Sequence, residues 1–267
     1  MNYIKLLFAF AVVLSLTSCT ITERMMINEN GGGKFSYEID GSKMMSMMGG
    51  AFKGDSDKKE GAEAKPKKAI DSTFSFKEIF ASKKDSIAKL SLEEQQRLKK
   101  MENFTMHMVM NEAKGEMRYS MDTDFKSVQD LQDLMSPMES MKSMSPKGVN
   151  SKKLGKASSA LDNNSSTKYF YNGKSFKKIV SKSTVKKASS KKEAPKEDAE
   201  AQQMKESMEM IYGQSDFKIV YQFPKAVKSV SIPNALFSDD RKTVTIEYPL
   251  KDYMESPDKL NFEIEFQ

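Results

Sequence analysis

The sequence predicts an α+β protein in which an antiparallel sheet, built from β-hairpins, carries a few packed helices. Several stretches alternate apolar and polar residues with a period of two, which is typical of half-buried strands. Other stretches repeat apolar residues every three or four positions, as helices do. Lys- and Ser-rich segments separate these patterns and are expected to be disordered loops.

Three pairs of stretches have the pattern of hairpins. In the clearest one, Phe104 to Met110 places a phenylalanine and three methionines on one face, and Met117, Tyr119 and Met121 alternate again after a turn. An earlier pair runs from Ile21 to Asn28 and from Phe35 to Ile39 around three glycines. A third carries the Asn172-Gly173 dipeptide, which favours a two-residue hairpin turn.

Helices are predicted where a capping residue precedes helical spacing. Asp124 is the expected N-cap of a helix from Phe125 to Met135, and Ser91 opens a capping box for a helix ending near Met101. Two further helices are expected over residues 43–48 and 202–212. Four strands rich in β-branched and aromatic residues complete the chain, over residues 217–223, 227–232, 243–248 and 260–266.

The composition narrows the classes of protein to which the chain can belong. It has 267 residues, with 43 Lys+Arg, 37 Asp+Glu, one His and one Cys. No run reaches the roughly 20 apolar residues of a membrane-spanning helix, so a polytopic membrane protein is excluded. A lone cysteine forms no disulfide within the chain and supports no cysteine-based zinc site. Low-complexity segments cover about 53–69, 143–166 and 181–201.

The first nineteen residues have the pattern of an export signal. Lys5 precedes an apolar stretch from Leu6 to Leu16, and the stretch ends in Leu16-Thr17-Ser18-Cys19. About eleven residues is the length of a signal peptide rather than of a transmembrane helix.

This ending resembles the lipobox of bacterial lipoproteins. The resemblance implies that residues 1–18 are a type II signal peptide and that residues 19–267 form a single envelope domain. It also implies that Cys19 carries a diacylglycerol through its sulfur, so the partner is a membrane that the protein does not span. Thr20, where an Asp is associated with retention at the inner membrane, favours the outer membrane of a gram-negative bacterium. For the mature chain, the sequence indicates a non-catalytic binding or structural role.

Methionine supports a second hypothesis, a copper-binding envelope protein. Met44, Met45, Met47 and Met48 form a cluster, and thioethers are soft ligands that select Cu(I). The competing interpretation is that methionine fills gaps in an irregular core. No other cofactor is expected.

A strongly basic stretch supports a third kind of contact. Between Lys142 and Lys192 there are 14 lysines against one acid, Asp162. Such a stretch attracts anionic lipid or an acidic envelope protein, and it also fits a solvated linker. Nucleic acid is not expected as a partner in this compartment.

Signatures of catalysis are absent from the sequence. There is no Gly-x-Ser-x-Gly and no His-Glu-x-x-His, and His107 is the only imidazole. An uncharacterised carboxylate-based hydrolase is the least favoured alternative. Ser72 and Ser86 follow aspartates in a pattern that resembles the Asp-Ser-apolar sites of bacterial O-glycosylation.

Overall fold

The computed structural model describes residues 20–43, 69–111, 113–132, 165–182, 209–210 and 213–267. Within them, two sheets are formed. The larger has eight strands in the order β10-β11-β8-β1-β2-β5-β4-β3, and the smaller has four in the order β6-β7-β12-β9. Neighbouring strands are antiparallel except for β1 and β8, which are parallel.

The strands of the large sheet are β1 (Thr20–Ile27), β2 (Gly33–Asp40), β3 (Ala69–Ser75), β4 (Thr105–Asn111), β5 (Glu116–Phe125), β8 (Asp216–Gln222), β10 (Leu236–Phe237) and β11 (Thr243–Pro249). Those of the small sheet are β6 (Ser165–Tyr171), β7 (Ser175–Lys182), β9 (Val227–Val230) and β12 (Phe262–Phe266). The helices are α3 (Phe76–Ser82), α4 (Lys84–Ile87), α5 (Leu92–Met101), α9 (Leu250–Glu255) and two 3₁₀ turns, η2 (Val128–Leu131) and η3 (Pro257–Leu260). The coarse prediction of antiparallel sheets with few helices is therefore confirmed.

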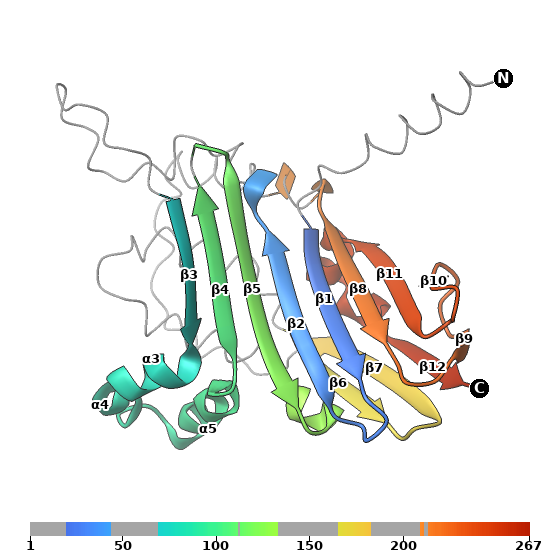
Figure 1. Ribbon diagram of the computed structural model, residues 1–267, viewed down its shortest axis with the longest axis horizontal. Helices are drawn as coiled ribbons and strands as arrows, with labels where there is room; N and C mark the ends of the chain where they lie inside the picture. Colours follow the sequence, from blue (N-terminus) through green and yellow to red (C-terminus); the bar gives the residue numbers. More distant parts are fainter. Residues whose placement is uncertain (1–19, 44–68, 112, 133–164, 183–208, 211–212) are drawn as a thin grey trace.

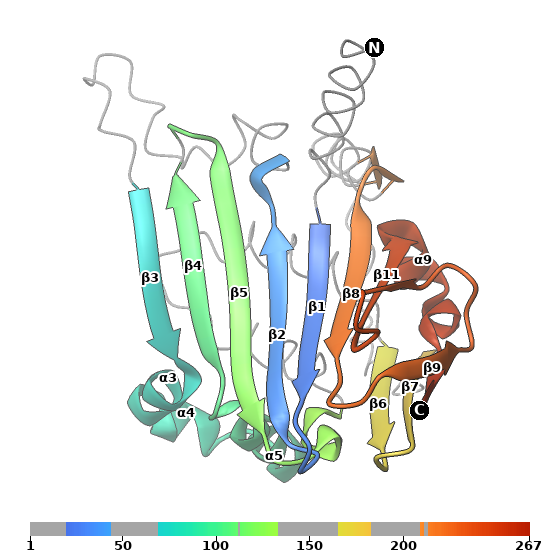
Figure 2. The ribbon, with the colours of Figure 1, turned by 45° about the vertical axis from the view of Figure 1, so that its right-hand side comes forward.

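The core lies between the two sheets. The small sheet covers one face of the part of the large sheet formed by β8, β1 and β2 (Figures 1 and 2). Phe176 of β7 and Phe217 of β8 are completely buried, and Phe176 makes an edge contact with Tyr221 at 5.3 Å between ring centroids. Aromatic rings from both sheets pack against one another in this layer.

Among the described residues, the helices beside the other part of the large sheet, β3 to β5, lie at its lower end. There α3 and α5 bring Phe76, Phe80, Leu98 and Met101 into the core beside Phe104 (Figure 1). The helix predicted from Ser91 is observed as α5.

Turn glycines fix the ends of two strand pairs. A Cβ on Gly33 would lie 1.8 Å from the carbonyl oxygen of Met26, so only glycine fits where β1 and β2 meet. Gly173 has a φ of +77°, in the left-handed region, in the turn that joins β6 to β7.

The predicted helix from Phe125 to Met135 is wrong in its described part. β5 continues through Asp124 to Phe125, and only the short η2 follows. The cap is Ser127, whose N–H donates to the Asp130 carboxylate at 3.0 Å. One turn is enough to bury Val128 and Leu131, and the next described residue, Gln132, is already extended.

Strand β3 was not predicted, because its sequence is polar and five of its residues are charged, hydroxylated or small. The low-complexity segments are also shorter than predicted. Ala69 belongs to β3, Ser165 and Ser166 belong to β6, and residues 181–182 belong to β7. The remainder of those segments, and most of the helices predicted over 43–48 and 202–212, lie outside the described residues.

Candidate functional site

The most unusual feature of the core is a carboxylate in the middle of β1. The strand turns Ile21, Glu23, Met25 and Ile27 toward the small sheet, because alternate residues share one face. Glu23 is only 5% exposed. A charged group at that depth needs partners, since an unpaired buried charge costs several kcal/mol, about the whole stability of a small domain.

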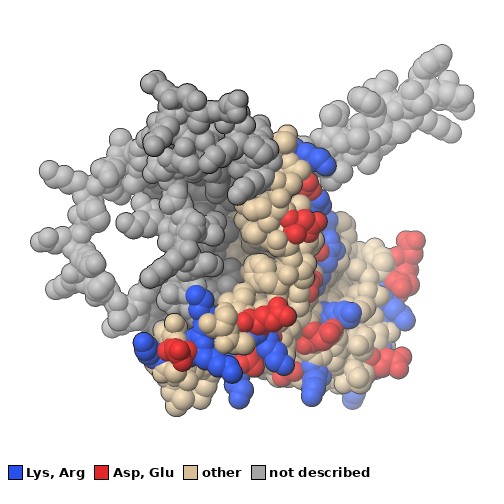
Figure 3. Space-filling view, turned by 60° about the vertical axis from the view of Figure 1, so that its left-hand side comes forward, with Lys and Arg blue, Asp and Glu red and all other residues tan. Residues whose placement is uncertain are grey.

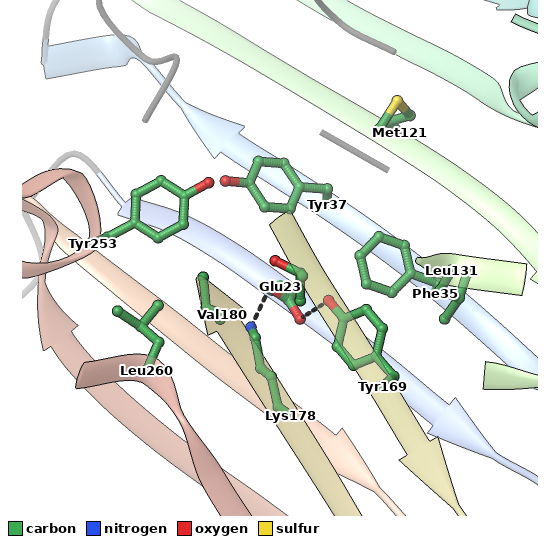
Figure 4. A pocket seen from close by; sticks show the side chains of 11 residues that line it. Glu23, Phe35, Tyr37, Met121, Leu131, Tyr169, Lys178, Val180, Tyr253 and Leu260 are labelled. Atoms are coloured by element: carbon green, nitrogen blue, oxygen red, sulfur yellow. Dashed lines mark hydrogen bonds and ion pairs between the residues drawn. The ribbon is translucent and has the colours of Figure 1, made fainter. Parts of the chain in front are cut away.

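Three groups satisfy Glu23. Lys178 Nζ donates to Oε2 at 2.7 Å, the Tyr169 hydroxyl donates to Oε1 at 2.8 Å, and the Tyr221 hydroxyl donates to the same oxygen. Lys178 is itself 1% exposed, on the inward face of β7 between Phe176 and Val180. Figure 4 shows the lysine and Tyr169 reaching the carboxylate from the small sheet. The cluster of Glu23, Lys178, Tyr169 and Tyr221, called here the buried cluster, therefore links the two sheets.

Burial dominates the ionisation of this region. It lowers the pKa of Lys178, and the attraction of Glu23 opposes that shift. Burial also raises the pKa of Tyr169 and Tyr221 well above the usual value, and the negative charge of Glu23 adds to the effect. The pKa of Tyr37 is also raised, first by burial and then by Tyr253. The hydroxyl groups of these two tyrosines face each other (Figure 4). These phenols stay protonated, so they act as hydrogen-bond donors.

A cavity of about 20 Å³ lies beside the buried cluster, lined also by Phe35, Met121 and Leu260. That volume holds about one water molecule. Ligand pockets are usually about 300–1,000 Å³, so no organic substrate fits. The chemistry of the buried cluster is that of a polar link between layers.

A larger hollow lies on the opposite face of the large sheet. This groove has a volume of about 590 Å³ and crosses strands β4, β5, β2, β1, β8 and β11. Its charged residues are Arg24, Lys34, Asp122 and Asp124. Arg24 pairs with Glu38 at 3.3 Å. Charges of both signs also alternate over the face seen in Figure 3. This mixture differs from the single-sign surface that binds nucleic acid.

The predicted site residues are distributed as follows. Cys19 and the cluster of Met44, Met45, Met47 and Met48 lie outside the described residues. Thr20, directly after Cys19, is the first residue of β1. Ser72 is exposed on β3 and Ser86 is exposed on α4, so both hydroxyl-bearing residues lie at the surface.

His107 lies on β4, with its Nε2 2.8 Å from Asp71 Oδ1 of the edge strand β3. Both side chains are exposed. Ser120 is opposite His107 on β5, but its hydroxyl donates to Asp122. His107 lines neither the cavity nor the groove.

Part of the basic stretch belongs to β6 and β7, where the sequence predicts the third hairpin, but the sequence did not predict that one of its lysines is buried. Lys178 is buried, and Lys177 pairs with Glu263 at 3.6 Å. The alternation of Phe176, Lys178 and Val180 was the available signal, because it places the lysine on an apolar face. On β1, Glu23 alternates in the same way with the apolar residues Ile21 and Met25, which also places it on an apolar face.

Strands β4 and β5 bring several methionines together. Met110 is opposite Met117 and Met106 is opposite Met121 across β4 and β5, and Met108 lies between them on the same face. Met117 is 4% exposed, yet it is not part of the core cluster formed by the two sheets, and neither are Met108 and Met110.

No known family, curated protein or solved structure matches this chain. Among the described residues, no helix is long and apolar enough to cross a membrane. The same residues contain no group of three or more His, Cys, Asp or Glu side chains arranged to hold a metal ion.

Proposed function

We propose that the protein is a lipid-anchored cell-envelope protein whose β-sheet domain has a binding or structural role and no catalytic one. The observation that carries this proposal is the position of Thr20. The lipobox cysteine is followed at once by β1, in the interior of the large sheet between β8 and β2. The sequence of the anchor and the start of the fold therefore adjoin without a linker.

The anchor accounts for the location. A diacylglycerol on the Cys19 sulfur, with an acyl group on the new amino terminus, gives the stable attachment that a single chain does not. By the resemblance to lipoproteins, Thr20 directs the protein to the outer membrane of a gram-negative envelope.

A non-catalytic role is supported by the shape of the described region. The buried cavity holds about a water molecule, and the groove is a mixed-charge surface without an imidazole or a cysteine. We propose that the Lys- and Ser-rich segments are solvated loops between hairpins. Their lysines then remain available to anionic lipid or to an acidic envelope protein, apart from the buried Lys178 and the paired Lys177.

Replacement of the acylated residue tests the proposal. We expect Cys19→Ser to abolish the fatty-acid mass increment on the mature protein and to move the protein from the membrane to the soluble envelope fraction. Ser18→Ala is the matched control, since it keeps a small residue before the cysteine. If the parent protein lacks the increment, or if Cys19→Ser fractionates as the parent does, the proposal is wrong.

A second candidate is the binding of Cu(I). It is favoured by the pairing of Met110 with Met117, with Met108 beside them, because cross-strand side chains have Cβ atoms about 4.5–5.5 Å apart. The segment that begins at Met44 leaves β2 next to them, since the Met117 N–H donates to Ser42 Oγ at 3.1 Å.

Titration of the full chain with Cu(I) against a chromogenic chelator tests this candidate. Met→Leu replacement at 108, 110 and 117 is expected to remove binding, and the same change at 44, 45, 47 and 48 separates the two clusters. The buried Met25→Leu is the control. Retention of Cu(I) by a variant that carries all seven replacements excludes these sites.

A further inference from the structure

The position of Thr20 also defines which end of the large sheet is nearest to the anchor. β1 runs away from Cys19, so the start of β1 is the near end and the β1–β2 turn is the far end. Because of the strand directions, the near end also contains the end of β2, the start of β5 and the end of β4. The β4–β5 turn, of which residues 113–115 are described, is therefore at the same end of the sheet as the start of β1 (Figure 1).

The β4–β5 turn reaches further than the anchor point. Ile21 is paired with Ile39, which puts Thr20 level with Asp40, and Asp40 is paired with Arg118. Glu116 lies two residues beyond Arg118, which corresponds to roughly 7 Å along the strand, and the turn lies beyond Glu116. Two strand spacings, roughly 10 Å, separate β5 from β1 sideways.

This geometry leaves little freedom. One peptide unit, about 3.8 Å, connects Cys19 to Thr20. Acyl chains in the hydrocarbon layer hold that residue at the level of the headgroups. When the strands stand upright on the membrane, a structure that extends several ångströms past that residue and lies only about 10 Å away meets the same layer.

The side chains at the turn fit such a layer. Ala113 and Lys114 are exposed, and no described acid pairs with the Lys114 ammonium. Behind them Met110 is half-buried opposite Met117, outside the core between the sheets. A cation at the tip with apolar side chains behind it is the arrangement that an anionic lipid surface accepts. The far end differs, since its β1–β2 turn, residues 28–32, has Glu29 and no lysine, whereas in the β4–β5 turn Lys114 follows Glu112 in the sequence.

We infer that the β4–β5 turn, residues 113–115, with the half-buried Met110 behind it, is a membrane-contact surface that rests on the headgroups of the leaflet holding the anchor. This inference depends on the proposed lipidation of Cys19. It adds a fixed orientation, in which the strands of the large sheet point away from the membrane and the groove and the far-end turns face the aqueous side.

A fluorescent probe on a single introduced cysteine tests the orientation. Because Cys19 carries the lipid, Ala113→Cys and Glu29→Cys each provide a single free thiol in the acylated full chain. The proteins are labelled with a polarity-sensitive dye and reconstituted in vesicles of phosphatidylethanolamine and phosphatidylglycerol that contain a headgroup-attached quencher. We expect a blue shift and quenching at residue 113, and neither at residue 29.

Two further variants keep the outcome interpretable. Ten Gly and Ser residues inserted between Cys19 and Thr20 are expected to abolish the quenching at residue 113 and to leave acylation intact. Lys114→Glu is expected to reduce the quenching in these anionic vesicles, with no change in the mass of the lipidated protein. If residues 113 and 29 are quenched equally in acylated protein, the contact surface is wrong while the anchor stands. If the acyl mass itself is missing, the anchor is wrong.

Discussion

The two halves of the large sheet have similar strand patterns and different surroundings. In β1 and β8, which face the small sheet, inward residues such as Ile21, Met25 and Ile219 are at most 2% exposed. In β4, which the small sheet does not cover, Met106, Met108 and Met110 are only half-buried. Alternation therefore sets which side chains share a face. A face becomes part of the core only where the small sheet covers it. A polar residue on a covered face then needs hydrogen-bond or ion-pair partners.

The largest effect is expected from removing one partner of the buried ion pair. Lys178→Met leaves the Glu23 carboxylate inside the core without its cation, which costs about 3–5 kcal/mol. Urea unfolding at neutral pH measures the loss. Glu23→Gln with Lys178→Met is the control, because it removes both charges and is expected to recover part of the stability. A single variant as stable as the parent would show that the pair is not buried in solution.

The same truncation in the two halves sharpens the comparison. Met25→Ala, in the layer between the sheets, is expected to lower the free energy of unfolding by about 2–5 kcal/mol. Met108→Ala, on the uncovered half, is expected to cost about 1 kcal/mol or less, because a half-buried side chain loses less contact. Equal costs in chemical denaturation would mean that another layer covers β4 as tightly as the small sheet covers β1.

Alkaline pH is expected to destabilise first the half of the large sheet that the small sheet covers. The pKa of Tyr37, Tyr169 and Tyr221 is raised above its ordinary value of 10.0, and burial raises that of Tyr248 to about 12. A group whose pKa is raised by folding stabilises the folded state fully below its unfolded pKa, and this contribution is lost as the pH rises past it. Stability should therefore fall above pH 10.0, as the tyrosines ionise on unfolding.

Lys178 has the opposite effect, because folding lowers its pKa. Its contribution to the free energy of unfolding therefore becomes more favourable as the pH rises toward the pKa of the lysine in the unfolded chain. The four tyrosines named above, whose pKa values are raised, outnumber this single lysine, so the net effect of alkaline pH is expected to be destabilising. Absorbance of phenolate against pH, in parallel with circular dichroism, checks the sign. Phenolate that appears well below the loss of structure would contradict the burial of these rings.

The smallest effect is expected on the outer face. Arg24 and Glu38 form an exposed pair on β1 and β2, and Arg24 directly follows Glu23 along the chain. Exposed pairs contribute about 0–1 kcal/mol, so Arg24→Ala should change the midpoint of unfolding only slightly. A cost near that of Lys178→Met would mean that something covers the groove.

The local sequence determined the strands and the faces of the covered half. Period-two alternation predicts strands at the positions of β1, β2, β4 and β5, β-branched and aromatic content predicts those at β8, β9, β11 and β12, and the spacing after Ser91 predicts α5. The same alternation fails for β3, because an edge strand with polar residues on both faces carries no periodic signal. It also fails after Asp124, where helical spacing over one turn cannot be distinguished from a longer helix.

Only the tertiary structure decided what each face meets. Glu23 and Lys178 are 155 residues apart, and nothing near either one indicates the other. The parallel pairing of β1 with β8 likewise joins residues from opposite ends of the chain. The physical reason is that periodicity is a property of neighbouring residues, whereas the partner of a buried charge is chosen by the packing of two sheets. The proposed anchor is the exception, because the resemblance to the lipobox rests on Leu16 to Cys19 as a linear motif that needs no fold.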